Sequence, residues 1–293
     1  MRILLTGALG FTGRHFAARA TALGHTVVEL RADLTDAKAV KEALTSCGPI
    51  EAVVHLAGIA FVGHADNTAF YAVNTVGTTV LLDGLATQAR QDRPVRVLLA
   101  SSANVYGNAE HSPIRETQPA APVNHYAASK LAMEHMAQTF TDRLHVVIAR
   151  PFNYTGPDQS ADFLIPKLVD HFARKAPVIE LGNLHVEREF NDVRMVCDAY
   201  LGLLDKGVSG RVYNVCTGQT HTLQTVLDTL EALTGHRIQV RVNPAFVRPN
   251  EVHRLCGDPG RLLECVGGLQ AHPLRETLRS MLDSVRVINV DPA

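Results

Sequence analysis

Short hydrophobic runs alternate with amphipathic segments along the first half of the chain. A segment of helical periodicity follows each of five compact runs rich in Val, Ile and Leu, at residues 2–6, 26–30, 51–55, 95–100 and 145–150. Unbroken apolar runs are typical of strands that are covered on both faces, and their alternation with helices indicates βαβ units. The pattern therefore predicts an α/β fold built on a doubly wound parallel sheet.

The pattern of the sequence changes after Arg150, where Pro and Gly interrupt shorter elements. In this half we expect four helices, near residues 160–174, 193–206, 222–235 and 273–287. The sequence predicts a sheet domain over residues 1–155, to which some later segments return, and a smaller lobe made mainly of residues 156–293. The two should share a cleft beyond the carboxyl ends of the strands, where ligands of open α/β sheets bind.

Three glycines follow the first predicted strand and open a helix, in the segment Thr6-Gly-Ala-Leu-Gly-Phe-Thr-Gly13. Gly7 permits the tight turn, Gly10 lets the backbone approach a pyrophosphate, and Gly13 allows the helix to pack closely on the strand. The anion would lie at the N-terminus of the helix, where backbone N–H groups are unpaired. The segment thus predicts a dinucleotide-binding loop and makes residues 1–155 a Rossmann domain.

The end of the second predicted strand indicates which dinucleotide binds. An NAD site usually has an acidic residue there for the ribose 2'-hydroxyl, whereas this strand ends in Arg31, whose guanidinium suits a 2'-phosphate. Glu29 lies two residues earlier on the same face of the strand, so NAD stays open. NADP(H) is favoured over NAD, with Asp33 and Leu34 placed for a polar and an apolar contact with adenine.

Tyr126 and Lys130 stand four residues apart and follow a Ser101-Ser102 pair. Residues i and i+4 share one face of a helix, so we expect the ammonium to lie beside the phenol and to lower its pKa. A phenol ordinarily titrates at about 10, and such a shift would make Tyr126 an acid–base catalyst at a useful pH. The hydroxyl of Ser102 would hold the substrate oxygen.

The chain resembles the extended short-chain dehydrogenase/reductase family of sugar-nucleotide enzymes, also called the NAD-dependent epimerase/dehydratase family, over almost its whole length. Besides the glycine loop and the Tyr/Lys pair, the resemblance rests on His55-Leu-Ala-Gly58, Asn74-x-x-Gly-Thr78, Ser101-Ser-x-x-Val-Tyr-Gly107 and Arg150-Pro-Phe-Asn153. It implies that Ser102 and Tyr126 contact the reacting sugar oxygen. It also implies that Lys130 binds the nicotinamide ribose and tunes Tyr126, and that Asn74 supports the site.

The same resemblance implies further ligand contacts. Cofactor contacts are expected from Leu9, Phe11, Leu56, Ala57, Gly58 and Pro151, and Asn153 should contact the diphosphate of a sugar nucleotide. In the second half, residues 177–193 and 248–258 are similar to the GDP-sugar branch of the family, which includes 4,6-dehydratases and 6-deoxymannose reductases. By this similarity the substrate is GDP-linked, and its diphosphate and ribose are held by Arg188, Arg248 and Glu251. A surface ion pair is the alternative role for Glu251.

The residues after Ser102 distinguish the reaction types. Sugar-nucleotide 4,6-dehydratases carry a Glu, often Asp-Glu, at this place, but here Ala103 and Asn104 follow, and neither is an acid or base at neutral pH. In the same family, the epimerase-reductases that invert C3 and C5 use a cysteine and a histidine, and no cysteine stands at the matching place after the serines here. We therefore expect NADPH-dependent reduction of GDP-4-dehydro-6-deoxy-D-mannose to a GDP-6-deoxyhexose such as GDP-rhamnose. An NAD-dependent sugar-nucleotide 4-epimerase and, in another class, a non-catalytic NADP-binding sensor are the alternatives.

Composition narrows the range of partners. The 28 basic and 29 acidic residues give a net charge of -1, which favours neither nucleic acid nor a membrane surface. No apolar stretch approaches the roughly 20 residues of a membrane span, the five cysteines form no CxxC pair, and the 14 histidines form no metal-spaced cluster. We expect a cytoplasmic enzyme without a metal. The family resemblance implies a homodimer formed through helices at about residues 66–90 and 124–143.

Overall fold

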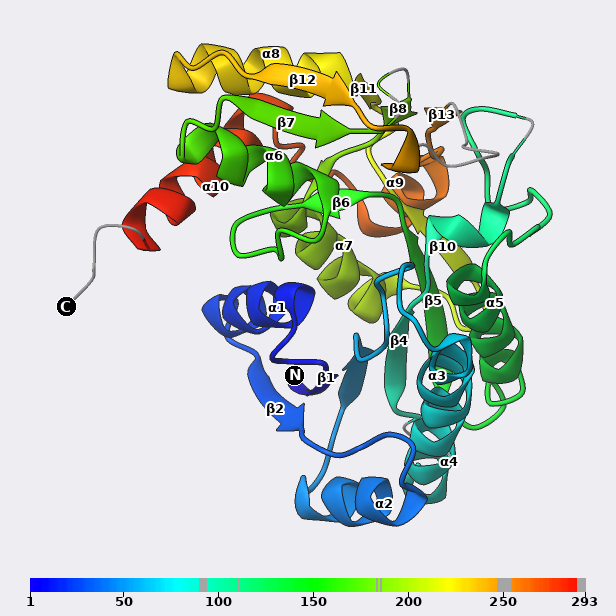
Figure 1. Ribbon diagram of the computed structural model, residues 1–293. Coiled ribbons are helices and arrows are strands. Elements are labelled where there is room, and N and C mark those ends of the chain that lie inside the picture. The colour runs from blue at the N-terminus through cyan, green and yellow to red at the C-terminus, as the bar shows by residue number, and fades with distance from the viewer. Residues whose placement is uncertain (90–93, 110, 183, 185, 247–253, 289–293) are drawn as a thin grey trace.

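A parallel sheet of six strands lies between layers of helices in the computed structural model (Figure 1). The structure describes residues 1–89, 94–109, 111–182, 184, 186–246 and 254–288. In spatial order the strands are β10 (Val212–Val215), β5 (His145–Pro151), β4 (Arg96–Ala100), β3 (Ala52–His55), β1 (Arg2–Thr6) and β2 (Thr26–Leu30). Five of them match the sequence prediction to within one residue at either end. The sixth, β10, comes from the second half of the chain.

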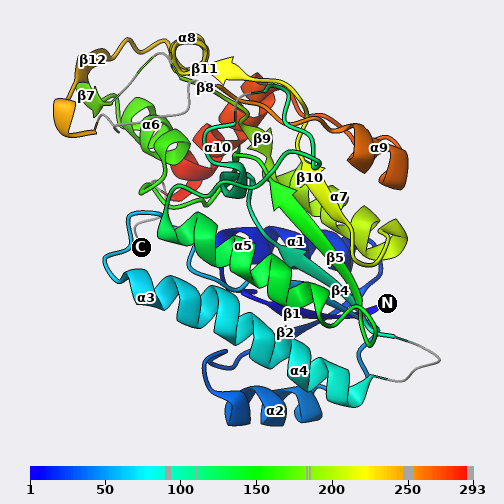
Figure 2. The same cartoon turned by 90° about the vertical axis from the view of Figure 1, so that its right-hand side faces the viewer.

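Helices cover both faces of the sheet, so the predicted doubly wound α/β fold is confirmed (Figure 2). The helices of these layers are α1 (Phe11–Ala22), α2 (Ala37–Ser46), α4 (Thr78–Gln88), α5 (His125–Gln138) and α7 (Val193–Lys206). On one face α1 packs against α7, around a core that includes Phe16 and Tyr200. On the other face α2, α4 and α5 share a second core with Leu81 and Met133. Both faces of the strands are therefore apolar, which is why the strands read as unbroken hydrophobic runs.

Segments from the second half of the chain complete the first domain. β10 pairs with β5 in the central sheet, and α7 buries Val196 and Leu203 against that sheet. The sequence suggested that later segments return to the first domain. The exact division at residue 155 stays a prediction.

The smaller lobe has its own hydrophobic core. Three helices, α6 (Leu164–Ala173), α8 (Leu223–Thr234) and α10 (Leu274–Ile288), enclose it with Leu168, Leu230 and Leu278. β7 (Val178–Leu181) pairs with β12 (Gln239–Val242), and β8 (Glu187–Arg188) pairs with β11 (His221–Thr222) and β13 (Arg254–Leu255). The four helices expected in this half are present as α6, α7, α8 and α10, although α6 begins later than predicted.

Short elements connect the two cores. β6 (Tyr154–Thr155) pairs with β9 (Asn191–Asp192), and α9 (Gly260–Val266) packs on α7. The remaining pieces are α3 (Asn67–Phe70), the π-helical turn η1 (Tyr71–Gly77), and the 3₁₀ turns η2 (Ala103–Tyr106) and η3 (Pro244–Phe246). α3, η1 and α4 follow one another without a break, and α5 packs on this segment. These are the helices through which a dimer was predicted, and that interface stays a prediction.

The strand order reverses its direction between β1 and β3. From β1 the chain continues to β2 on one side, and from β3 it continues to β4 on the other, so the connections leave the carboxyl edge of the sheet in opposite directions. Open α/β sheets bind ligands at such a point. Within the described residues no helix is long and apolar enough to cross a membrane, and no three His, Cys, Asp or Glu side chains are grouped to hold a metal ion. All five cysteines are free thiols.

Candidate active site

The glycine loop after β1 is too tightly packed for side chains. Gly7 has a φ of +70°, and a Cβ there would lie 2.7 Å from the backbone nitrogen of Ala57. A Cβ on Gly13 would lie 2.1 Å from the carbonyl oxygen of Gly7. The loop that follows β1 thus touches the loop that follows β3, and α1 starts directly against it. This close packing agrees with the tight turn expected at Gly7 and the close helix contact expected at Gly13, whereas cofactor binding by these residues stays a prediction.

The N-terminus of α1 is open to an anion. Its N-cap is Gly10, no described side chain caps the helix, and its first turn holds no acidic residue. The unpaired N–H groups and the helix dipole both favour negative charge at this place. Leu9 is 68% exposed on the loop, and the ring of Phe11 stacks on that of Tyr154 with 6.1 Å between the ring centroids. A loop with glycine at positions 7, 10 and 13 against an uncapped helix fits a dinucleotide diphosphate.

The residues predicted to bind the adenosine part lie after β2. Arg31 and Glu29 form an exposed ion pair, with Nη2 of Arg31 2.5 Å from Oε2 of Glu29. Asp33 accepts hydrogen bonds from the backbone and the hydroxyl of Thr35, and these bonds lower the pKa of its carboxyl. Leu34 differs from expectation because it is buried in the core, where a Cβ on Gly77 would meet it at 2.9 Å. Its side chain therefore has little surface left for an adenine ring.

The predicted catalytic side chains come together at the carboxyl end of β4. Tyr126 and Lys130 lie on α5, and Ser102 follows the strand; all three are buried. The Ser102 hydroxyl lies close enough to the phenol of Tyr126 to lower its pKa. Lys130 Nζ donates to the carbonyl oxygen of Ala100 at 2.8 Å. The end of β4 and one face of α5 therefore bring a serine, a tyrosine and a lysine together in one buried site.

Burial changes the pKa values of this group in a way that the sequence did not predict. Burial raises the pKa of Tyr126, against the effect of the hydrogen bond from Ser102. The expected lowering by a neighbouring ammonium is wrong for the protein alone, because Lys130 turns its Nζ to the carbonyl of Ala100. Burial also lowers the pKa of Lys130 to about 8, although the nearby carboxylate of Glu134 raises it.

Asn74 lies in the π-helical turn and joins two parts of the site. Its Nδ2 donates to the hydroxyl of Ser129 at 3.1 Å, and its Oδ1 accepts from the backbone of Ile59 at 2.9 Å. A Cβ on Gly58 would lie 2.7 Å from Asn74 Oδ1 and 3.3 Å from Lys130 Nζ. Asn74 therefore fixes the loop after β3, which contains Leu56, against α5. A side chain at position 58 would displace both Asn74 and Lys130.

A buried histidine beneath this group begins the His55–Gly58 motif, but the sequence gave it no role. His55, the last residue of β3, lies between the hydroxyls of Thr6 and Thr78, at 2.7 and 2.8 Å. Because Thr78 donates to the carbonyl of Asn74, its oxygen accepts from His55 Nε2. Burial, and secondarily the charge of Lys130, lowers the pKa of His55 to about 3. The ring is therefore neutral and connects the glycine loop to the turn that carries Asn74.

A buried ion pair behind Lys130 was also missed. Glu134 stands one helical turn after Lys130 on α5, and Arg150 precedes Pro151, the last residue of β5. Their closest atoms are 2.6 Å apart, and Ser101 donates its hydroxyl to the same carboxylate. The spacing of Glu134 from Lys130 was the available signal, but an i,i+4 carboxylate on a helix is usually a surface pair.

The residues predicted for the sugar nucleotide are less closely grouped. Asn153 follows β5 with an exposed side chain, and its carbonyl accepts from the backbone and amide of Asn191 at 2.9 and 3.2 Å. Arg188 lies half-buried in β8 of the smaller lobe and donates to the carbonyl of Glu187 at 2.9 Å. Arg248 and Glu251 lie outside the described residues. These four contacts stay predictions.

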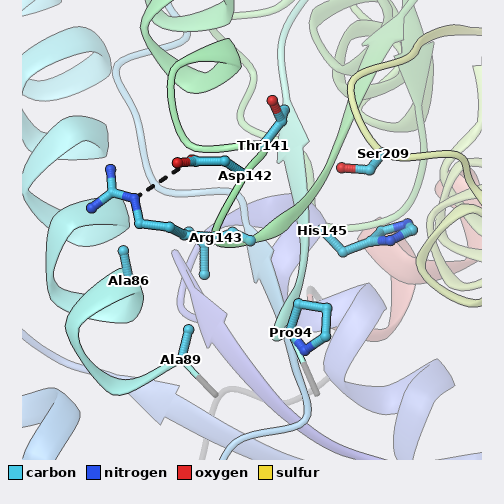
Figure 3. A pocket seen from close by; sticks show the side chains of 9 residues that line it. Ala86, Ala89, Pro94, Thr141, Asp142, Arg143, His145 and Ser209 are labelled. Atoms are coloured by element: carbon cyan, nitrogen blue, oxygen red, sulfur yellow. Dashed lines mark ion pairs between the residues drawn. The ribbon is translucent and has the colours of Figure 1, made fainter. Parts of the chain in front are cut away.

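A cavity at the other end of the sheet is unrelated to the motif residues. It has a volume of about 480 Å³ and is lined by Pro94, Arg143, His145 and Ser209, among others (Figure 3). Pro94 and His145 mark the amino ends of β4 and β5, whereas Ser102 follows the carboxyl end of β4. The candidate active site is therefore the carboxyl edge, where the sequence motifs meet.

Comparisons with known proteins agree with this geometry. A family described as GDP-mannose 4,6 dehydratase matches residues 29–281. GDP-6-deoxy-D-talose 4-dehydrogenase from Aggregatibacter actinomycetemcomitans is 34% identical over 272 residues, covering 91% of this chain and 92% of that protein. GDP-6-deoxy-D-mannose reductase from Pseudomonas aeruginosa is 33% identical over 297 residues, covering 96% of each.

Solved structures show the same relationship. The structure of RMD from Pseudomonas aeruginosa complexed with NADPH has a TM-score of 0.90 and 32% identity, covering 98% of this chain and 100% of that one. A candidate epimerase from Burkholderia cenocepacia has a TM-score of 0.91 and 46% identity, with 98% of both chains covered. Similarity in sequence and in fold therefore extends over nearly the full length of these proteins.

Proposed function

This chain belongs to the GDP-mannose 4,6-dehydratase family of extended short-chain dehydrogenases/reductases, and we propose that it reduces the C4 ketone of GDP-4-dehydro-6-deoxy-D-mannose with NADPH. The product would be GDP-6-deoxy-D-mannose. One observation carries the proposal: Ser102 lies beside a buried Tyr126 at the carboxyl edge of the sheet and lowers the pKa of its phenol, and no acid or base follows at positions 103 and 104.

The name of the family does not decide the reaction, because one fold supports several chemistries. Elimination of water needs a second acid–base group beside the tyrosine. Ala103 is buried in η2 and Asn104 cannot exchange a proton at neutral pH. Oxidoreduction at C4 needs the tyrosine alone, which supports a reductase over a dehydratase.

Each residue has a distinct role in the proposed reduction. Tyr126 gives its proton to the C4 oxygen, and the raised pKa of its phenol keeps that proton in place until it is needed. Ser102 donates a hydrogen bond to the same oxygen and spreads its developing charge. Lys130 holds the nicotinamide ribose with its ammonium. When NADPH is bound, it supplies the hydride.

The cofactor preference is proposed from the end of β2. Arg31 offers an exposed guanidinium for a 2'-phosphate, and the RMD structure holds NADPH. Glu29 competes for that guanidinium, so the preference for NADPH over NADH should be moderate. Asn153, Arg188, Arg248 and Glu251 are proposed to bind the GDP part.

An absorbance assay tests the proposal directly. Purified protein is given NADPH or NADH with the GDP-, UDP- or dTDP-linked 4-keto-6-deoxy sugar, and reduced nicotinamide is followed. We expect consumption of NADPH with the GDP-linked sugar. Unchanged absorbance with every sugar would contradict the proposal.

The Tyr126→Phe variant tests the assignment of the acid. We expect turnover to fall by about 10²–10⁴-fold while NADPH binding, measured by fluorescence, stays nearly intact. Tyr213→Phe is the matched control, since it removes a phenol that hydrogen-bonds Val208 N near the amino end of β10. Unchanged turnover in Tyr126→Phe would refute the role of Tyr126.

The configuration of the product at C4 is a finer part of the proposal. The two relatives named above are described by 6-deoxy-D-talose and by 6-deoxy-D-mannose, sugars that differ at C4, and their identities to this chain are nearly equal. Proton NMR of the product distinguishes the two by the coupling of H4 to H3 and H5. We expect the D-mannose configuration.

An NAD-dependent 4-epimerase is the second candidate, because the Burkholderia cenocepacia protein is described as a candidate epimerase. An epimerase would purify with bound NAD+ and would consume no added cofactor. Arg31 counts against an NAD-dependent epimerase, because its guanidinium suits the 2'-phosphate of NADP(H). A non-catalytic sensor would bind NADPH without any turnover, and the presence of Ser102, Tyr126 and Lys130 together counts against that role.

A further inference from the structure

The ion pair of Glu134 and Arg150 lies directly behind the proposed catalytic group. Arg150 donates twice to the carboxylate, from Nε at 2.9 Å and from Nη2 at 2.6 Å. The side chains of Glu134 and Arg150 are only 5% and 8% exposed. The ring of Tyr106 covers the guanidinium at 4.7 Å, and its hydroxyl donates to Asn214 at 2.7 Å. The pair is thus rigidly held from three elements.

The pair is connected to the strand end that carries the catalytic contacts. Ser101 donates its hydroxyl to Glu134. On one side of Ser101, the carbonyl of Ala100 receives Lys130 Nζ. On the other side, Ser102 lies beside the phenol of Tyr126 and lowers its pKa. Glu134 therefore anchors the middle of a three-residue segment whose two ends hold the lysine and the tyrosine.

The charges around Lys130 make Glu134 important for its protonation. Glu134 faces Lys130 from α5, His55 faces it from β3, and Arg150 stands behind Glu134 on β5, while Tyr126 precedes Lys130 by about one turn of α5. Of these four groups, Glu134 carries the negative charge, because His55 is neutral and Tyr126 keeps its proton. Burial lowers the pKa of Lys130 to about 8, and the carboxylate opposes that change.

We propose that Glu134, fixed by Arg150, is a positioning residue that keeps Lys130 protonated and holds Ser102 in line with Tyr126. The proposal rests on the reductase function above. Arg150 balances the carboxylate, so the three side chains together carry one positive charge. Lys130 can then remain a cation in a buried site, because its counter-ion Glu134 is itself buried and is paired with Arg150.

The variant Glu134→Gln tests the proposal by the pH profile of kcat/KM. The amide keeps the size of the side chain and an oxygen for Ser101, but removes the negative charge. We expect the alkaline limb to move to lower pH by about one unit or more, which at a pH of about 8.5 reduces kcat/KM roughly tenfold. At a pH of about 6, where Lys130 is charged in both proteins, any remaining loss of kcat reports a displaced Ser102.

A second readout does not depend on catalysis. The chain has six lysines, so 13C NMR of labelled lysine Cε can follow each titration, with Lys130→Arg identifying the resonance. We expect the Lys130 midpoint to fall in Glu134→Gln. Arg194→Gln is the matched control, since it breaks the ion pair with buried Asp192 and should leave Lys130 unchanged.

The double variant Glu134→Gln/Arg150→Gln covers the case in which the single variant does not fold, because it leaves no unpaired buried charge. We expect its Lys130 midpoint to lie below that of the wild type as well. A wild-type midpoint in this variant would overturn the positioning role. Failure of the wild-type protein to reduce any of the sugars would instead overturn the proposed function, whatever the lysine titration shows.

Discussion

Two ion pairs in this protein have almost the same closest distance and opposite surroundings. Glu134 and Arg150 approach to 2.6 Å and are 5% and 8% exposed, behind the catalytic group. Glu29 and Arg31 approach to 2.5 Å and are 36% and 71% exposed, at the end of β2. The first pair is enclosed by Ser101 and Tyr106, whereas the second faces solvent.

The difference shows that burial, and not distance, decides what such a pair does. Breaking a buried pair leaves one charge without water or a partner, so the pair acts as a fixed structural unit. An exposed pair exchanges its partner for water or for a ligand at little cost. The chain therefore keeps a permanent charge cluster under the catalytic residues and an exchangeable one at the edge where the cofactor phosphate is proposed to bind.

The largest expected effect comes from breaking the buried pair. Arg150→Met leaves the carboxylate of Glu134 buried and unpaired, and we expect the free energy of unfolding to fall by about 3–5 kcal/mol. Arg31→Met should lower it by less than about 1 kcal/mol. Urea unfolding monitored by circular dichroism measures both. Equal losses in the two variants would contradict the comparison.

A buried histidine gives the next largest effect, and it depends on pH. The pKa of His55 is about 3 in the folded protein and lies below its ordinary value of 6.5. The unfolded chain therefore binds the proton first, so stability falls as the pH drops below 6.5 and continues to fall until about 3. At a pH of about 4 we expect this to cost about 3 kcal/mol.

Comparison with His55→Gln isolates this contribution, because the other titrating groups are common to both proteins. The difference in unfolding free energy between the wild type and this variant should change by that amount between neutral pH and a pH of about 4. A constant difference would show that His55 is not kept neutral by burial.

An ion pair of intermediate exposure sharpens the comparison. Asp192 and Arg194 lie 2.8 Å apart, with 1% and 41% of their side chains exposed. In Arg194→Met the carboxylate keeps its hydrogen bonds from Thr277 and from the backbone of residue 194. We expect a loss of about 1–3 kcal/mol in unfolding free energy, between the values for Arg150→Met and Arg31→Met. A loss of unfolding free energy outside that interval would contradict the proposed dependence on burial.

The smallest effect on stability belongs to the exposed pair, whose variants should change cofactor binding instead. Arg31→Met should weaken NADPH binding about tenfold, or about 1.4 kcal/mol, with little change for NADH. Glu29→Gln should strengthen NADPH binding severalfold, because the guanidinium no longer has a competing carboxylate. Fluorescence titration at low and high salt measures both. NADPH affinities that match the wild type in both variants would remove Arg31 from the phosphate site.

Sequence patterns were sufficient for the fold and for much of the site. Strands buried on both faces leave unbroken Val, Ile and Leu runs, and the glycine loop needs conformations that few residues allow, so both are readable from one chain. The spacing of Tyr126 and Lys130 correctly placed them on one helix face. The direction of the Lys130 side chain was not readable, because its flexible stem reaches a carbonyl on a strand that is distant in sequence.

The sequence by itself therefore determined five strands of the sheet, the glycine loop and the Tyr126/Lys130 pair, because these follow from local periodicity and spacing. The roles proposed for the other site residues came from the family resemblance. Only the tertiary structure decided which charges are buried together. It brought Glu134 and Arg150 behind Lys130, enclosed His55 between two threonines, and placed Leu34 in the core. Burial and partner choice arise when distant segments pack, and the pKa of a side chain follows from that packing.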